Sequence, residues 1–181
     1  MLEAEQDILE QARAGDTGAF EKIYRAYSGM VYGLALRMTG REEDAEEVTQ
    51  DVFVAAHRNL GGFIGTASLK TWFYRITVNT ALNAIKRNKR RRSEFRMEEG
   101  VEFEDVRNDV SESVERESQE AEAAEMLARL NPDQKACLLL RAKEGLSYEE
   151  IAGVLKVNIN TVRTRLKRAR EALLVFRRRR G

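Results

Sequence analysis

The sequence predicts an all-α protein built as two small helical domains joined by an acidic flexible linker, with a helix-turn-helix in the second domain. Three observations support this fold class. The 181 residues contain one proline, and apolar residues recur at helical spacing over long segments. A short helix, a tight turn and a longer basic helix follow one another over 145–174. Between two neutral-to-basic parts, residues 93–124 hold twelve acidic against three basic residues.

The change in charge divides the chain into a first domain over 1–92, a linker over 93–119 and a second domain over 120–181. The length alone allows one domain or two small ones. The linker has the glutamate- and serine-rich, apolar-poor composition of disordered segments. We therefore expect two bodies and a flexible tether.

The bulk composition excludes several classes of protein. The single cysteine, Cys137, cannot form an intramolecular disulfide, and its apolar neighbours indicate a buried structural thiol. His57 is the single histidine, and a hydrolytic site would need a metal cluster or a nucleophile–base pair. We expect no catalysis and no cofactor. No run of about 18 apolar residues and no signal sequence is present, so we expect a cytoplasmic protein without a membrane span.

The first domain begins with three amphipathic helices. The first covers 2–14 and ends at Gly15, and Asp16 is a good N-cap for the second, which reaches Gly40. The third covers 41–59, with small and branched apolar residues on its inner face and mostly acidic residues on its outer face. That outer face is either a solvated surface or a docking surface for a basic partner helix.

A glycine-rich loop over 60–68 precedes a fourth helix, which we expect from Leu69 to about Lys86. Phe63 in the loop is expected to be exposed. The helix mixes aromatic with basic side chains, which suits unpaired bases and phosphates, although packing in the core is the better interpretation for Trp72. Residues 86–92 hold six basic residues in seven, and they either grip backbone phosphate or form the favoured basic end of a helix.

The second domain contains recognisable helix caps. Asn131 is followed by proline at the first helical position. Ser147 and Glu150 form a capping box for the short helix of the helix-turn-helix. Asn160 is the expected N-cap of the longer helix, which then begins at Thr161.

The longer helix has two different faces. Its core face carries Val162, Leu166, Ala169 and Leu173. Its other side carries Thr164, Lys167 and Arg168, flanked by Arg163 and Arg165. A helix of this kind fits the major groove of DNA, where arginine pairs with guanine or phosphate. The alternative is an ordinary surface helix with solvated arginines.

At these residues the chain resembles a known family. GLSYEEIA at 145–152 and TVRTRLKRAREAL at 161–173 are similar to the promoter-binding helix-turn-helix of bacterial sigma factors. The length and layout resemble the extracytoplasmic-function (ECF) group of the sigma-70 family. DAEEVTQDVF at 44–53 is similar to the segment that docks on the clamp coiled coil of RNA polymerase, and 63–83 to the segment that melts and reads the −10 element. Asn160 stands where the family commonly has glycine, and Leu69 where an aromatic residue is frequent.

The resemblance implies three sets of functional residues. Those for binding core polymerase are Asp44, Glu47, Gln50, Asp51 and Phe53. Those for the −10 element are Phe63, Lys70, Trp72, Arg75, Asn79, Arg87 and Arg90. Those for the −35 element are Thr161, Arg163, Thr164, Arg165, Lys167 and Arg168. In the family, a phenylalanine and an asparagine at the positions of Phe63 and Asn79 hold an extruded base.

The implied partners are the β′ clamp and the β flap of the polymerase core, promoter DNA and an anti-sigma factor. An alternative function is a stand-alone helix-turn-helix regulator that does not become a polymerase subunit. The amino-terminal helices argue against it, because a regulator would need a ligand pocket there. An enzyme such as a nuclease is the other alternative, and the lack of a compact Asp/Glu/His cluster in the sequence argues against it.

Overall fold

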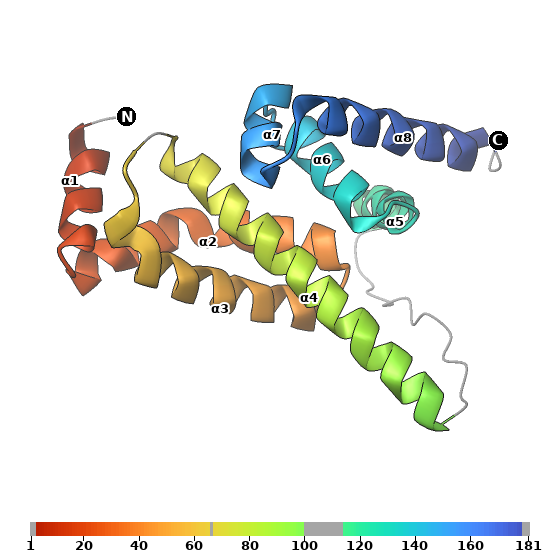
Figure 1. The fold of residues 1–181 in the computed structure, drawn as a ribbon, viewed down its shortest axis with the longest axis horizontal. Coiled ribbons are helices and arrows are strands. Elements are labelled where there is room, and N and C mark those ends of the chain that lie inside the picture. Colours follow the sequence, from red (N-terminus) through yellow and green to blue (C-terminus); the bar gives the residue numbers. More distant parts are fainter. Residues whose placement is uncertain (1–2, 66, 100–113, 179–181) are drawn as a thin grey trace.

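The computed structural model describes residues 3–65, 67–99 and 114–178, and these residues form helices and connecting loops without a strand (Figure 1). The elements of the first half are α1 (Glu3–Arg13), α2 (Thr17–Thr39), α3 (Glu42–Asn59), the 3₁₀ turn η1 (Leu60–Gly62) and α4 (Leu69–Glu99). Those of the second half are α5 (Val114–Ala128), α6 (Pro132–Ala142), α7 (Tyr148–Leu155) and α8 (Ile159–Arg178). The all-α prediction is confirmed.

Local sequence signals set most of the helix ends. Asp16 accepts a hydrogen bond from the backbone N–H of Ala19 at 2.7 Å, as an N-cap does. Gly40 ends α2 in the left-handed conformation at a φ of 76°, which costs glycine little. Asn131 and Ser147 each form the capping box expected of them.

The cap of α8 differs from the prediction. Asn158, not Asn160, caps the start of the helix, because the side-chain oxygen of Asn158 accepts a hydrogen bond from the backbone N–H of Asn160 at 2.8 Å. Lys156 closes α7 in the left-handed conformation, and α8 begins at Ile159, so the turn between the two helices is two residues shorter than expected. Asn160 therefore lies within the first turn of α8.

The end of α4 also differs. The sequence predicted an end near Lys86, whereas α4 continues to Glu99. Lysine, arginine and glutamate are good helix formers, and neither glycine nor proline occurs between Leu69 and Glu99. The basic run 86–92 is therefore helix interior, and its interpretation as a helix end is wrong.

Part of the predicted linker is helical at each end. Its first residues belong to α4 and its last ones, from Val114, to α5. The remaining part of the linker, 100–113, lies outside the described residues.

Helices α2, α3 and α4 enclose the core of the first half, with α1 packed against α2 (Figure 1). Aromatic rings fill its centre: the Phe73 ring lies 4.9 Å from that of Tyr27 and 5.4 Å from that of Phe53. In the second half, α6 and α7 pack on α8 around the buried Leu140, Ile151 and other apolar side chains. Each predicted surface is thus carried by a helix with a buried side.

The two halves pack against each other in this structure. Helices α6 and α7 lie along α4, and α6 also contacts α2 (Figure 1). The hydroxyl of Tyr74 on α4 donates a hydrogen bond to Glu144, and Lys135 donates one to the carbonyl of Met38 at 3.2 Å. Separate folding of 1–92 and 120–181 stays a prediction. Within the described part of the chain, no helix is long and apolar enough to cross a membrane.

Candidate nucleic-acid interface

The outer face of α3 presents three of the expected polymerase contacts to solvent. Glu47, Gln50 and Asp51 are exposed and lie within one turn of each other. Phe53 points the other way: it is 6% exposed, and its ring lies 4.6 Å from that of Tyr24. Phe53 therefore supports the helix from the core side.

Sequence reasoning missed an apolar spot on this same face. Val54, four residues after Gln50, is 49% exposed. It lines a shallow surface hollow with Phe20, Phe53, His57 and Arg58. A single valine among polar residues on the outer stripe was the available signal. The rings of His57 and Phe20 pack nearly perpendicular to each other, with 4.9 Å between the ring centroids, so His57 has a packing role.

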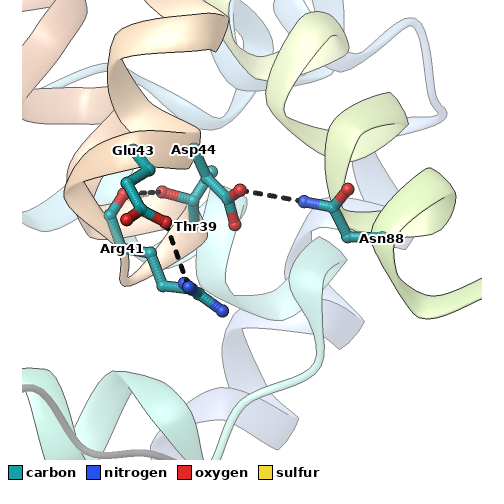
Figure 2. Close-up of polar contacts among 5 residues, drawn as sticks. All are labelled: Thr39, Arg41, Glu43, Asp44 and Asn88. Atoms are coloured by element: carbon teal, nitrogen blue, oxygen red, sulfur yellow. Dashed lines mark hydrogen bonds and ion pairs between the residues drawn. The ribbon is translucent and has the colours of Figure 1, made fainter. Parts of the chain in front are cut away.

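Two carboxylates of α3 are already in contact with α4. The side chain of Asn88 donates a hydrogen bond to Asp44 at 3.0 Å, across the gap between the two helices (Figure 2). Arg87 forms a 2.7 Å ion pair with Glu47. Asp44 and Asn88 line a small polar hollow that also includes Arg41 and Arg91. Of these two carboxylates, Glu47 is the more exposed to solvent.

The expected strand-reading residues lie on one side of α4. Trp72, Arg75 and Asn79 are three and four residues apart, so they follow one face of the helix. Arg75 and Asn79 are exposed, whereas Trp72 is half-buried, with its ring 5.4 Å from that of Phe73. The indole is thus part of the core and part of this face.

Phe63 is buried, and its expected exposure is wrong. The side chain is 6% exposed, because its ring packs on Trp72 with 5.4 Å between the ring centroids. The backbone N–H of Phe63 also donates to the carbonyl of Leu60 at 3.0 Å. Phe63 therefore fixes the glycine-rich loop against the start of α4, next to the side of the helix that carries Asn79.

The remaining basic residues assigned to the −10 element are all exposed on α4. Lys70 lies over the ring of Tyr74, with its amine 5.6 Å from the ring centroid. Arg90 follows one turn after Lys86 and is exposed, as is Arg87. Arg87 and Arg90 continue the side of Trp72 and Asn79 into a basic segment, whereas Lys70 lies on the side of Tyr74.

The exposed face of α8 carries four of the six residues assigned to the −35 element, which are Arg163, Thr164, Lys167 and Arg168. Arg163 donates to the side chain of Asn160 at 2.9 Å, and the hydroxyl of Thr164 donates to the carbonyl of Asn160 at 2.8 Å. Lys167 lies 3.9 Å from Glu171. These contacts hold the side chains along the helix, and all four residues stay exposed to solvent.

Arg165 and Thr161 are partly covered. The side chain of Arg165 is 24% exposed and forms a 2.9 Å ion pair with Asp133 at the start of α6. It also lies close to Cys137: burial raises the pKa of that thiol, and the guanidinium opposes the rise. Arg165 therefore joins α8 to α6 inside the domain.

No group of three or more His, Cys, Asp or Glu side chains suited to a metal ion occurs among residues 3–65, 67–99 and 114–178. The described residues offer a helix with an acidic exposed face, a helix with an aromatic and amide-bearing face followed by a basic segment, and a basic helix-turn-helix.

Comparison with known proteins agrees with this arrangement. The model of Sigma-70 region 2 matches residues 23–91, and that of Sigma-70, region 4 matches residues 120–173. The chain is 36% identical to the RNA polymerase sigma-H factor of Pseudomonas aeruginosa, over 96% of this chain and 94% of that protein. It is 34% identical to the ECF RNA polymerase sigma-E factor of Haemophilus influenzae, over 93% of each chain.

A solved structure has the same fold. The sigma factor RpoE of Bartonella quintana, bound to the anti-sigma factor NepR, superposes with a TM-score of 0.65 at 24% identity. The alignment covers 85% of this chain and 93% of that one. Together with the matched regions and relatives, this similarity shows that the chain belongs to the sigma-70 family of RNA polymerase sigma factors, in the ECF group.

Proposed function

We propose that the protein directs core RNA polymerase to specific promoters and assists strand opening by means of three separate surfaces. One surface, the outer face of α3, binds the polymerase. A second, on α4, reads the −10 element after the strands separate. The third, on α8, reads the duplex −35 element. The observation that best supports this division is that each surface occupies a different helix whose opposite side is buried.

The α3 surface suits the β′ clamp. Exposed Glu47 and Asp51 present negative charge, and Gln50 between them offers both a donor and an acceptor. Charge of one sign on a helix attracts a basic partner helix and fixes its register. The partly exposed Val54 adds an apolar contact at the end of the acidic stripe. Phe53 contributes by holding the helix in place.

The α4 surface suits single-stranded DNA. Asn79 offers an amide that pairs with the edge of an extruded base, and Arg75 and the basic segment contact phosphates. Trp72 and Phe63 form an aromatic support under the loop. An extruded base is available only after the duplex has opened, so this surface acts late.

The α8 surface suits the major groove. Its exposed arginines, Arg163 and Arg168, are suited to base edges or phosphates, and Thr164 to a short polar contact. Arg165 takes a structural role in the same helix. The helix-turn-helix context and the basic exposed face together support reading of a duplex.

The other partners follow from the family. The RpoE protein of Bartonella quintana is bound to the anti-sigma factor NepR, and we propose an anti-sigma factor for this chain as well. We further propose that the second domain contacts the β flap. The protein acts without catalysis of its own, in the bacterial cytoplasm where the polymerase works.

Reconstitution with core polymerase tests the proposal. The full chain is added to core enzyme and a template with the promoter of its own operon, and run-off transcripts are measured. We expect transcripts only when both proteins are present. Binding of the chain to this promoter, without core binding or transcripts, would instead identify a stand-alone regulator.

A further inference from the structure

Arg87 belongs to two surfaces of the molecule at once. It lies in the basic segment of α4 that we assign to DNA phosphates. Its guanidinium nevertheless forms a 2.7 Å ion pair with Glu47, on the α3 face that we assign to the polymerase. One residue later, Asn88 donates to Asp44 (Figure 2). The chain's own DNA-binding segment therefore occupies part of its docking face.

The ion pair is open enough to be replaced. The side chains of Arg87 and Glu47 are 45% and 54% exposed. Surface pairs of this kind shift an equilibrium by roughly two- to five-fold. Arg87 makes one contact to this carboxylate, from a terminal guanidinium nitrogen to Oε1 of Glu47. A second arginine that engages both carboxylate oxygens in the bidentate way has to displace that nitrogen. A bidentate arginine from a docking partner and Arg87 therefore compete for Oε1 of Glu47.

We infer that the Glu47–Arg87 pair is an autoinhibitory contact, which a cationic side chain of the polymerase breaks when it docks on α3. Displaced from Glu47, the Arg87 guanidinium becomes available to DNA phosphate. This inference rests on the proposed function, because it takes α3 as the docking face and the basic segment as a DNA contact. By linkage, docking and phosphate binding each favour the other.

The neighbouring contact allows Arg87 to move while the helices stay together. The Asn88–Asp44 hydrogen bond is partly buried and involves a neutral amide, and Arg41 and Arg91 line the hollow beside it. A partly buried bond is less exposed to competition from water or a partner than the half-exposed ion pair. Asp44 thus holds α3 against α4 while Glu47 changes its partner.

The test is the affinity of the full chain for core polymerase, measured by fluorescence titration. Arg87→Gln should bind core about two- to five-fold more tightly than the natural chain, because Glu47 is then free. Lys86→Gln is the matched control, since it removes the same charge from the adjacent exposed residue, about 100° further round the helix. Lys86→Gln should leave core affinity unchanged. Glutamine keeps a helix propensity close to that of arginine and lysine.

A second pair of variants separates this inference from the proposed function. Glu47→Gln should weaken core binding, and Glu47→Gln with Arg87→Gln should bind like Glu47→Gln alone. A second outcome is that Glu47→Gln weakens core binding while Arg87→Gln raises core affinity no more than Lys86→Gln does. In that case the autoinhibitory contact is overturned, and the assignment of α3 as the docking face remains. If Glu47→Gln binds core normally, Glu47 is not part of the docking face and the autoinhibitory contact is overturned, whereas the role of Gln50 and Asp51 is decided by their own variant.

Discussion

The hydroxyl of Tyr74 on α4 donates a hydrogen bond to the carboxylate of Glu144, which follows α6, and so joins the two halves of the chain. Burial, and then the bond to Glu144, raise the pKa of Tyr74 well above its usual range. The phenol therefore stays protonated, and stays a donor, at any pH at which the protein works. Tyr74 lies on the opposite side of α4 from Trp72 and Asn79, so this contact leaves the strand-reading side open.

Removing this donor should loosen the packing of the halves. Tyr74→Phe keeps the ring and leaves the carboxylate of Glu144 without its partner, at a cost of about 1–3 kcal/mol to the docked arrangement. Limited proteolysis should cut the natural chain first between 93 and 119, and the variant should be cut there faster. Tyr32→Phe, the same change on α2, is the control. Equal cutting rates in the two variants would show that this bond does not hold the halves together.

The docking face of α3 should be sensitive to truncation. Gln50→Ala with Asp51→Ala should weaken binding to core polymerase by roughly ten-fold or more, because central interface residues often cost over about 1 kcal/mol each. DNA binding by the carboxy-terminal half should not change. Glu10→Ala with Gln11→Ala makes equivalent changes on the exposed face of α1 and should keep full affinity. Unaltered affinity of the α3 variant in a pull-down titration would remove this helix from the interface.

The sequence predicted those features that depend on neighbours along the chain. The caps at Asp16, Asn131 and Ser147 are confirmed, because a side chain and a backbone N–H three residues later decide them. The all-α fold followed from helical periodicity in the same way. The predicted end of α4 near Lys86 is wrong, because the basic run and the acidic residues after it are good helix formers.

The features that sequence reasoning missed depend on distant contacts. Phe63 is buried because Trp72, on the far side of a loop, covers it. Arg87 reaches Glu47 from forty residues away, and Arg165 reaches Asp133 from another helix. The residue types at these positions suit the predicted roles. Which of these side chains remain exposed to solvent is decided by the packing of the helices.

Arg165 and Arg168 should therefore behave differently although both were assigned to DNA. Arg165→Ala breaks the ion pair with Asp133 and leaves Cys137 beside a gap, so it should lower the thermal stability of the domain. Arg168→Ala should keep the melting temperature and weaken binding to a −35 duplex by about 1–3 kcal/mol. Thermal unfolding and duplex titration on both variants separate the two effects. A stable Arg165→Ala variant with weak DNA binding would return Arg165 to the reading face.

Asn79 and Arg168 should act at different steps of initiation, because we propose that Asn79 contacts separated strands and Arg168 a duplex. With core polymerase present, Arg168→Ala should reduce formation of the closed complex, measured by retention of duplex promoter. Asn79→Ala should leave that step nearly intact and reduce the open complex, measured by permanganate reactivity of unpaired thymines. The order of events is the physical reason, because an amide that pairs with an extruded base gains that contact only after the base has left the stack. Each variant controls for the other, since both remove an exposed polar side chain from a helix. Normal opening by Asn79→Ala on every template would make Asn79 an ordinary surface residue of α4, and the strand-reading role would then fall to the aromatic and basic residues beside it.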